Sequence, residues 1–233
     1  MRQIILDTET TGLYADSGDR IIEVGCVELL NRRLTGHHKH FYLNPGRDSH
    51  PEALKVHGLS TEFLRDKPGF EAVADELLDY LQGSELIIHN AAFDVGFLNM
   101  ELALLGRPLL AEFVSGVTDT LAMAKEMFPG KRNSLDALCS RLGVDNSGRT
   151  LHGALLDAEL LADVYINMTR GQEALLIDAG AAQNVRQRVA PIDLSTLALP
   201  VLTASEHEMA AHEEVLAQID KASAGRTVWR LQA

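Results

Sequence analysis

An apolar run leads into two acidic residues in Gln3-Ile4-Ile5-Leu6-Asp7-Thr8-Glu9-Thr10-Thr11-Gly12. The apolar first half of this stretch predicts a buried strand, and Thr10-Thr11-Gly12 predicts the end of that strand. Because side chains alternate along a strand, Asp7 and Glu9 are expected to point to the same side. The two carboxylates have no basic neighbour in the sequence, and their hard oxygen atoms suit Mg²⁺ or Mn²⁺. Alone, the pair fits a solvated strand end equally well.

A further carboxylate follows a second apolar strand. Leu86-Ile87-Ile88 leads into His89-Asn90-Ala91-Ala92-Phe93-Asp94, and apolar residues then recur at helical spacing. Asp94 is therefore expected at a strand-to-helix junction, where the carboxyl ends of strands build sites. The alternative is an acid of the first helical turn that only complements the helix dipole.

The third element is His152-Gly153-Ala154-Leu155-Leu156-Asp157, which opens another predicted helix. His152 is expected just before this helix or in its first turn, and Asp157 about one turn further in. A histidine beside the flexible Gly153 and near an inward carboxylate suits a general base at a metal site. Alone, His152 fits a surface or capping histidine.

Taken in order, D-x-E-T-T-G, N-A-A-F-D and H-x4-D resemble the motifs of the DEDDh family of 3′→5′ exonucleases, over roughly residues 1–170. The resemblance implies an α/β fold of the ribonuclease H-like type, with a mixed five-stranded sheet flanked by helices. It implies that Asp7, Glu9, Asp94 and Asp157 hold two divalent cations, Mg²⁺ or Mn²⁺, at the 3′-terminal phosphate. Asp7 would bridge both ions, Glu9 and Asp157 would complete one site, and Asp94 would support the other through water. His152 would take the proton from the attacking water.

Other segments resemble, within this family, the proofreading subunits of bacterial replicative DNA polymerases: Leu30–Gly36, Val56-His57-Gly58, Phe128–Cys139 and Trp229-Arg230. This closer resemblance implies a chain that removes mismatched nucleotides from DNA 3′ ends beside a polymerase catalytic (alpha) subunit. A DEDDh ribonuclease that trims RNA 3′ ends is the nearest alternative, because the catalytic motifs do not separate the two.

The resemblance also implies a set of substrate-binding residues, which comprises Asp7, Glu9, Glu52, His57, Asp157, Thr10 and Leu13. Leu13 would pack on the terminal base, and Glu52 would accept a hydrogen bond from the 3′-hydroxyl. His57 would stack or contact phosphate, although a turn histidine before Gly58 is an equal alternative.

The net charge of −12 limits how the chain can meet nucleic acid. Proteins that grip DNA unaided are usually basic, so affinity for DNA alone is expected to be weak and a partner to deliver the substrate. The two cysteines, Cys26 and Cys139, lie in apolar patterns and are expected to be reduced core residues of a cytoplasmic protein. No apolar stretch approaches transmembrane length and no signal peptide precedes the first strand, so no membrane partner is expected.

The pattern predicts three parts: an exonuclease domain (1–171), a flexible linker (172–205) and a polymerase-binding segment (206–233). In the linker, Gln172, Leu175 and Ile177 resemble a peptide that binds the sliding clamp, although Ile177 replaces the usual aromatic residue. The last segment carries an amphipathic helix at 206–221 and then Trp229. Alternatively, this last segment packs back onto the exonuclease domain. A small theta-like accessory subunit is a further expected partner.

The expected strands are 2–7, 21–29, 34–43, 85–89 and 116–119, and the expected helices are 69–82, 94–105, 119–127, 134–142 and 153–169. The run His37-His38-Lys39-His40 is interpreted as part of an exposed strand. Two other classes of protein fit part of the pattern. A haloacid-dehalogenase-like phosphatase usually has Asp two residues after its nucleophile, where this chain has Glu9. A structural subunit without activity does not explain why all five catalytic residue types are present.

Overall fold

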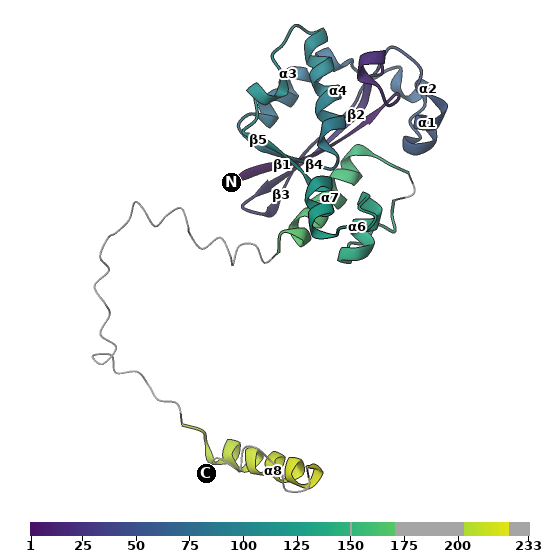
Figure 1. The fold of residues 1–233 in the computed structure, drawn as a ribbon. Coiled ribbons are helices and arrows are strands. Elements are labelled where there is room, and N and C mark those ends of the chain that lie inside the picture. The colour runs from purple at the N-terminus through teal and green to yellow at the C-terminus, as the bar shows by residue number, and fades with distance from the viewer. Residues whose placement is uncertain (150, 171–202, 224–233) are drawn as a thin grey trace, which may run out of the picture. The chain divides into compact units, whose positions relative to one another are not determined.

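A computed structural model describes residues 1–149, 151–170 and 203–223 (Figure 1). The chain divides into two units, Met1–Ile177 and Asp178–Ala233. The first unit contains the sheet and most of the helices, and the second contains one described helix.

The sheet of the first unit has five strands in the order β3-β2-β1-β4-β5. They are β1 (Arg2–Thr10), β2 (Ile21–Leu30), β3 (Arg33–Tyr42), β4 (Glu85–Ile88) and β5 (Gly116–Asp119). The first three are antiparallel, whereas β4 runs parallel to β1, and β5 parallel to β4. The predicted mixed sheet is confirmed. Strand β1 continues past the predicted end at residue 7, because β2 pairs with it as far as Thr10, with a register shift after Glu9.

Seven α-helices are described in this unit: α1 (Pro51–His57), α2 (Thr61–Leu64), α3 (Phe70–Leu81), α4 (Ala91–Leu104), α5 (Thr120–Met127), α6 (Leu135–Leu142) and α7 (Ala154–Met168). Two short 3₁₀ turns lie at Ala15–Ser17 and Leu110–Glu112. Helices α1 and α2 were not predicted, because they are too short to show a hydrophobic period. Helix α4 begins at Ala91, earlier than the predicted residue 94, so Asp94 lies within its first turn.

Helices cover both faces of the sheet, as Figure 1 shows for α3 and α4 on one side and α6 and α7 on the other. Ile4 and Leu6 pack with α3 and α4, whereas Ile5 packs with α5, α6 and α7. Because strand side chains alternate, Asp7 and Glu9 share the face of Ile5, under α7. Cys26 and Cys139 are buried and free, as predicted.

Gly25 permits the close approach of α7 to the sheet. It pairs with Asp7 across β1 and β2. A Cβ atom on Gly25 would lie 2.3 Å from the backbone carbon of Ala154 and from the nitrogen of Leu155. Glycine at this position therefore lets the first turn of α7 approach β2 directly beside Asp7.

The described helix of the second unit, α8 (Glu206–Ala222), confirms the predicted amphipathic helix. Ser205 and Glu208 form a capping box at its start. Met209, Val215 and Ile219 are exposed on it. None of the helices in the described part of the chain is long and apolar enough to cross a membrane.

Candidate active site

Three elements bring the four predicted carboxylates to one end of the sheet. Asp7 and Glu9 come from β1, Asp94 from the first turn of α4, and Asp157 from the first turn of α7. Asp94 is held against β1, because the backbone N–H and the hydroxyl of Thr8 both donate to its Oδ1, at 3.0 and 2.7 Å. The two helices thus place one carboxylate on each side of the strand that carries Asp7.

His152 lies on the segment just before α7, and Gly153 is the residue that caps this helix. The Nδ1 atom of His152 lies 3.3 Å from Oδ2 of Asp157. Glu9, His152 and Asp157 each offer a ligand atom, and these atoms lie within 4.8 Å of one another. Carboxylate oxygens with one imidazole nitrogen form a donor set that fits a divalent cation.

Burial and mutual repulsion disfavour negative charge on these carboxylates. Burial, and then the charges of Asp94, Asp157 and Glu9, raise the pKa of Asp7 well above its ordinary value. Burial, followed by Asp157 and Glu23, raises the pKa of Glu9 to about 8. Burial also raises the pKa of Asp94 to about 7, despite its hydrogen bonds from Thr8. A site with this much uncompensated negative charge favours added positive charge.

The structure adds Arg149, which nothing in the sequence pattern marked. Its Nε and Nη2 donate to the two oxygens of Asp157 at 2.5 Å, and its Nη1 donates to Asp136 at 2.6 Å. Asp7 and Glu9 have no basic neighbour in sequence, but the Arg149 charge lowers the pKa values of both, in opposition to burial. A basic residue three positions before His152 matches none of the motif spacings, so no pattern in the sequence pointed to it.

These groups line a cleft of about 460 Å³. Its lining residues are Asp7, His89, Leu121, Ser134, Leu135, Asp136, Arg149, His152 and Asp157. No role was predicted for His89, which only belongs to the segment before Asp94. Its Nδ1 lies 2.9 Å from the hydroxyl of Thr120, and burial lowers its pKa, which favours the neutral ring. The cleft therefore combines carboxylates, two histidines and one arginine.

A second, mostly apolar pocket of about 440 Å³ lies at α1 and brings together two of the predicted substrate residues, Leu13 and Glu52. Leu13 is 69% exposed, so its side chain is accessible to a ligand in this pocket. Gly12, Tyr14, Asp19, His50, Ala53 and Val56 complete the lining.

The two predicted substrate residues outside this pocket and the acidic cluster, Thr10 and His57, are directed inward. The hydroxyl of Thr10 is buried and donates to the carbonyl of Gly12. His57 is only 4% exposed, and its Nδ1 accepts from the N–H of Leu59 at 2.9 Å. Its Nε2 has no hydrogen-bond partner within the described residues. Stacking or phosphate contact by His57 would therefore require this side chain to move outward.

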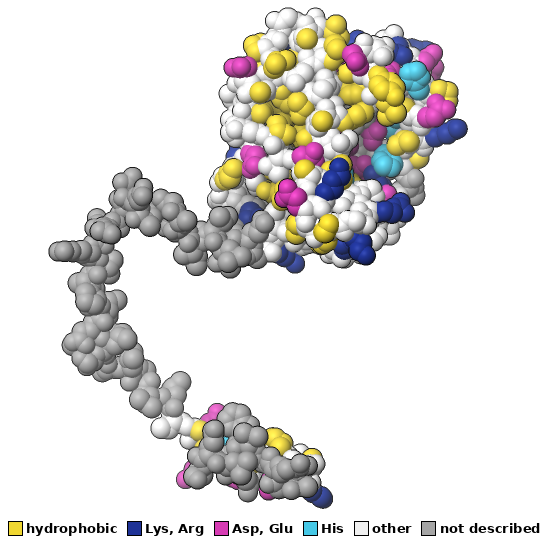
Figure 2. All heavy atoms as spheres, in the orientation of Figure 1, with side chains coloured by type: hydrophobic (Ala, Val, Ile, Leu, Met, Phe, Trp, Pro, Cys, Tyr) yellow, Lys and Arg dark blue, Asp and Glu magenta, His cyan; other side chains and the backbone are white. Residues whose placement is uncertain are grey.

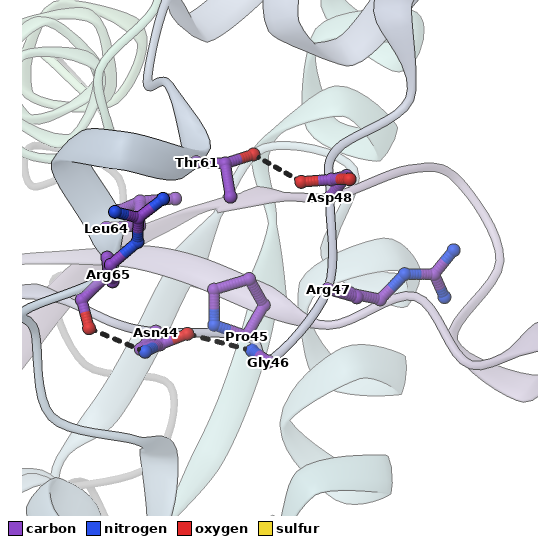
Figure 3. Close-up of a pocket in the computed structure, with 8 residues that line it drawn as sticks. All are labelled: Asn44, Pro45, Gly46, Arg47, Asp48, Thr61, Leu64 and Arg65. Carbon is purple, nitrogen blue, oxygen red and sulfur yellow. Dashed lines mark hydrogen bonds between the residues drawn. The ribbon is translucent and has the colours of Figure 1, made fainter.

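A smaller pocket between Asn44 and Arg65 does not form a convergent site (Figure 3). Its polar groups bond to one another: Thr61 to Asp48, and Asn44 to the backbone of Arg65 and Gly46. Arg47 points away from the others and donates to the carbonyl of Gly18.

The predicted partner-binding residues Gln172, Leu175, Ile177 and Trp229 lie outside the described residues. The linker and the clamp-binding peptide therefore remain predictions, as does the division of the chain into three parts.

Comparison with known proteins identifies the family. The model of the exonuclease family matches residues 4–165. The DNA polymerase III subunit epsilon of Salmonella typhimurium (strain LT2) is 52% identical, over 98% of this chain and 97% of that protein. The chain belongs to the exonuclease family, among the DNA polymerase III epsilon subunits. The epsilon subunit of Escherichia coli (strain K12) is 51% identical with the same coverage, and that of Rickettsia prowazekii is 56% identical over 75% of this chain and 76% of that protein.

Solved structures support the same fold. Exonuclease X in complex with 5′ overhanging duplex DNA has a TM-score of 0.57 and 24% identity, over 72% of this chain and 90% of that one. A 3′-exonuclease bound to a histone mRNA stem-loop has a TM-score of 0.60 and 18% identity, over 72% of this chain and 63% of that one. One neighbour is bound to DNA and the other to RNA, so the fold alone does not select the substrate.

The family assignment makes this chain a nuclease, and its acidic cluster the candidate metal centre of a metal-dependent enzyme. On the face in Figure 2, Lys and Arg side chains of the described residues lie in separate groups with Asp and Glu among them. That face carries no continuous basic strip among the described residues, in keeping with the acidic net charge.

Proposed function

We propose that this exonuclease removes mismatched nucleotides from DNA 3′ ends, as the proofreading subunit of a bacterial replicative DNA polymerase. The observation that carries the proposal is the clustering of five side chains. Asp7, His152 and Asp157 line one cleft, Glu9 offers a ligand atom beside those of His152 and Asp157, and the charge of Asp94 acts on Asp7. The near-full-length similarity to epsilon subunits supports the DNA substrate and the polymerase context.

The four carboxylates are proposed to hold two divalent cations, Mg²⁺ or Mn²⁺. When bound, such ions supply an activated water and stabilise the charge on the departing oxygen. Asp7 would serve both ions, since the charges of Asp94 and Asp157 both act on it. Glu9 and Asp157 would hold the ion near His152, and Asp94, held by Thr8, would support the other.

His152 is proposed to accept the proton of the attacking water. Its side chain is partly exposed and lies beside Asp157, so it can reach both solvent and the carboxylate cluster. Leu13 and Glu52 are proposed to meet the terminal base and the 3′-hydroxyl, because they line one pocket. Contacts of Thr10 with the nucleotide would then use its backbone, since its hydroxyl bonds internally.

The proposed partners are the polymerase catalytic (alpha) subunit, the sliding clamp and a small theta-like subunit, all acting in the cytoplasm. The exposed apolar residues of α8 support a protein contact by residues 206–233. A chain truncated near residue 185 should keep nuclease activity and lose the polymerase. Clamp binding should fall when Gln172 and Leu175 are both replaced by alanine, and unchanged binding would refute the clamp contact.

The assignment of roles is tested by two substitutions with different expected effects. Asp7→Ala should remove both Mn²⁺ binding and nuclease activity, because it removes a ligand. His152→Ala should remove most activity but leave the fold and at least one Mn²⁺ site intact. Near-normal turnover of either variant, measured on a DNA strand with a mismatched 3′ end, would contradict its role.

The alternative function, trimming of RNA 3′ ends, rests on the same catalytic cluster. Matched DNA and RNA strands, compared under the same metal conditions, separate the two. Faster removal of deoxynucleotides supports proofreading, and faster removal of ribonucleotides supports the alternative.

A further inference from the structure

Arg149 is the cation that the acidic cluster holds in this structure. Its Nε and Nη2 donate hydrogen bonds to the two oxygens of Asp157, each at 2.5 Å. Two parallel hydrogen bonds from a guanidinium to a carboxylate are strong and directional. The Arg149 side chain is only 6% exposed, so this pair is formed inside the cleft.

The same carboxylate belongs to the candidate metal centre. Asp157, Glu9 and His152 are the side chains whose ligand atoms lie within 4.8 Å of one another. A divalent cation between them would lie beside the guanidinium and would be repelled by it at this short range. Asp157 can therefore serve Arg149 or a metal ion, but not both with full strength.

Arg149 also occupies His152. Its Nη2 lies 2.7 Å from Nδ1 of His152. Because a guanidinium only donates hydrogen bonds, Nδ1 must accept, and the ring proton is then assigned to Nε2. In this arrangement the lone pair of Nδ1 is occupied, so His152 is oriented beside Asp157 and can act as the proposed general base only after Arg149 withdraws.

We propose that Arg149 is a positioning residue that holds Asp157 and His152 in the metal-free chain and withdraws from Asp157 when a divalent cation binds. The inference rests on the proposed metal-dependent function. Asp136 supplies the partner that remains: its side chain is 56% exposed, lies on α6, and bonds Nη1 of Arg149 at 2.6 Å. The exchange replaces one positive charge with another, so Asp157 is never left buried without a counter-charge.

Calorimetric titration of the full-length chain with Mn²⁺ alone tests this exchange. Arg149→Gln removes the competing cation, and Mn²⁺ should bind about tenfold more tightly because no fraction of the chain is blocked. Arg149→Lys restores the charge without the two-pronged geometry and should bind Mn²⁺ with intermediate affinity. Arg141→Gln is the matched control, since Arg141 bonds Asn133 and the carbonyl of Arg132 instead of the cluster.

A second measurement uses the unaltered protein and does not depend on how well a variant folds. The Nε–Hε resonance of Arg149, assigned by its loss in Arg149→Lys, is followed by NMR during titration of chelated protein with Mg²⁺. It should shift as Mg²⁺ binds, because Nε leaves Asp157. The corresponding resonance of Arg141 should stay in place.

The possible results distinguish a wrong metal centre from a wrong role for Arg149. If the unaltered chain fails to bind Mn²⁺, the proposed metal centre is wrong, and the exchange falls with it. If it binds Mn²⁺ but Arg149→Gln binds equally or less tightly, Arg149 only orients Asp157 and the exchange is refuted. An equal gain in Arg141→Gln would reduce the effect to net charge, and an unmoved Arg149 resonance at saturating Mg²⁺ would also overturn the proposal.

Discussion

The backbone N–H of His152 donates a hydrogen bond to the carbonyl oxygen of Val56 at 3.0 Å. Val56 lines the pocket that contains Leu13 and Glu52, and it belongs to α1. A second contact lies beside the first, because the side chain of Leu151 covers Gly58. The pocket proposed for the terminal base is therefore joined directly to the segment that carries the proposed general base.

Gly58→Ala should disturb this connection. Gly58 has φ +71°, and a Cβ there would lie 2.6 Å from Cδ1 of Leu151, next to His152. We expect turnover on a mismatched DNA end to fall several-fold. Gly83→Ala is the control: it has φ +69° and open space, so it should lose only about 1–2 kcal/mol of unfolding free energy, which is what a left-handed backbone costs alanine. Equal activity of the two variants would show that the contact with Leu151 is unimportant.

Gly25→Ala should displace the start of α7. The new methyl group would meet backbone atoms of Ala154 and Leu155, which cannot rotate away. Overpacking of this kind costs about 1–3 kcal/mol, and the shift should move both His152 and Asp157. We expect lower thermal stability and strongly reduced exonuclease activity. Gly116→Ala, in β5 with open space, should change neither, and a fully active Gly25→Ala protein would contradict the packing argument.

Thr8→Val should loosen Asp94 without changing the volume of the core much. The hydroxyl of Thr8 donates to Oδ1 of Asp94, and a hydrogen bond to a charged group is worth about 1.5–3 kcal/mol. We expect about tenfold slower turnover at saturating Mg²⁺ with an unchanged circular dichroism spectrum. Thr118→Val, which removes a hydroxyl bonded to Glu85, should keep normal turnover. Normal activity in Thr8→Val would remove Thr8 as a support of Asp94.

The stability of the metal-free chain should fall as the pH rises. The folded protein keeps a proton on Glu9 up to a pKa of about 8 and on Asp94 up to a pKa of about 7, whereas the unfolded chain loses both near their ordinary values of 4.5 and 3.8. Between these limits the folded state binds more protons, so unfolding free energy decreases with rising pH. In excess chelator, the melting temperature should fall by roughly 10 °C or more from pH 5 to pH 8.

Saturating Mg²⁺ should reduce this fall, since metal binding favours the deprotonated carboxylates. A melting temperature in chelator that stays constant or rises over the same pH range would mean that these carboxylates are ionised in the folded protein. The raised pKa values of Glu9 and Asp94 described above would then be wrong.

Much of the fold followed from the sequence because its signals are local. Apolar runs before Asp7 and Asp94 predict two strands, and the helical period after His152 predicts a helix. These elements meet at one end of the sheet. Helices α1 and α2 escaped detection because their few residues carry no period. The role of Arg149 depends on its contact with Asp157, and that of Gly25 on its contact with Ala154, and no local pattern encodes either contact.

The acidic cleft is proposed to cut DNA from its 3′ end with divalent metal ions. We would follow a 5′-labelled DNA strand with a mismatched 3′ end, incubated with the purified chain and Mg²⁺ or Mn²⁺, with a chelator control. We expect a ladder that shortens from the 3′ end only when metal is present. Cleavage that persists in chelator, or a DNA strand left whole while a matching RNA strand is trimmed, would contradict it.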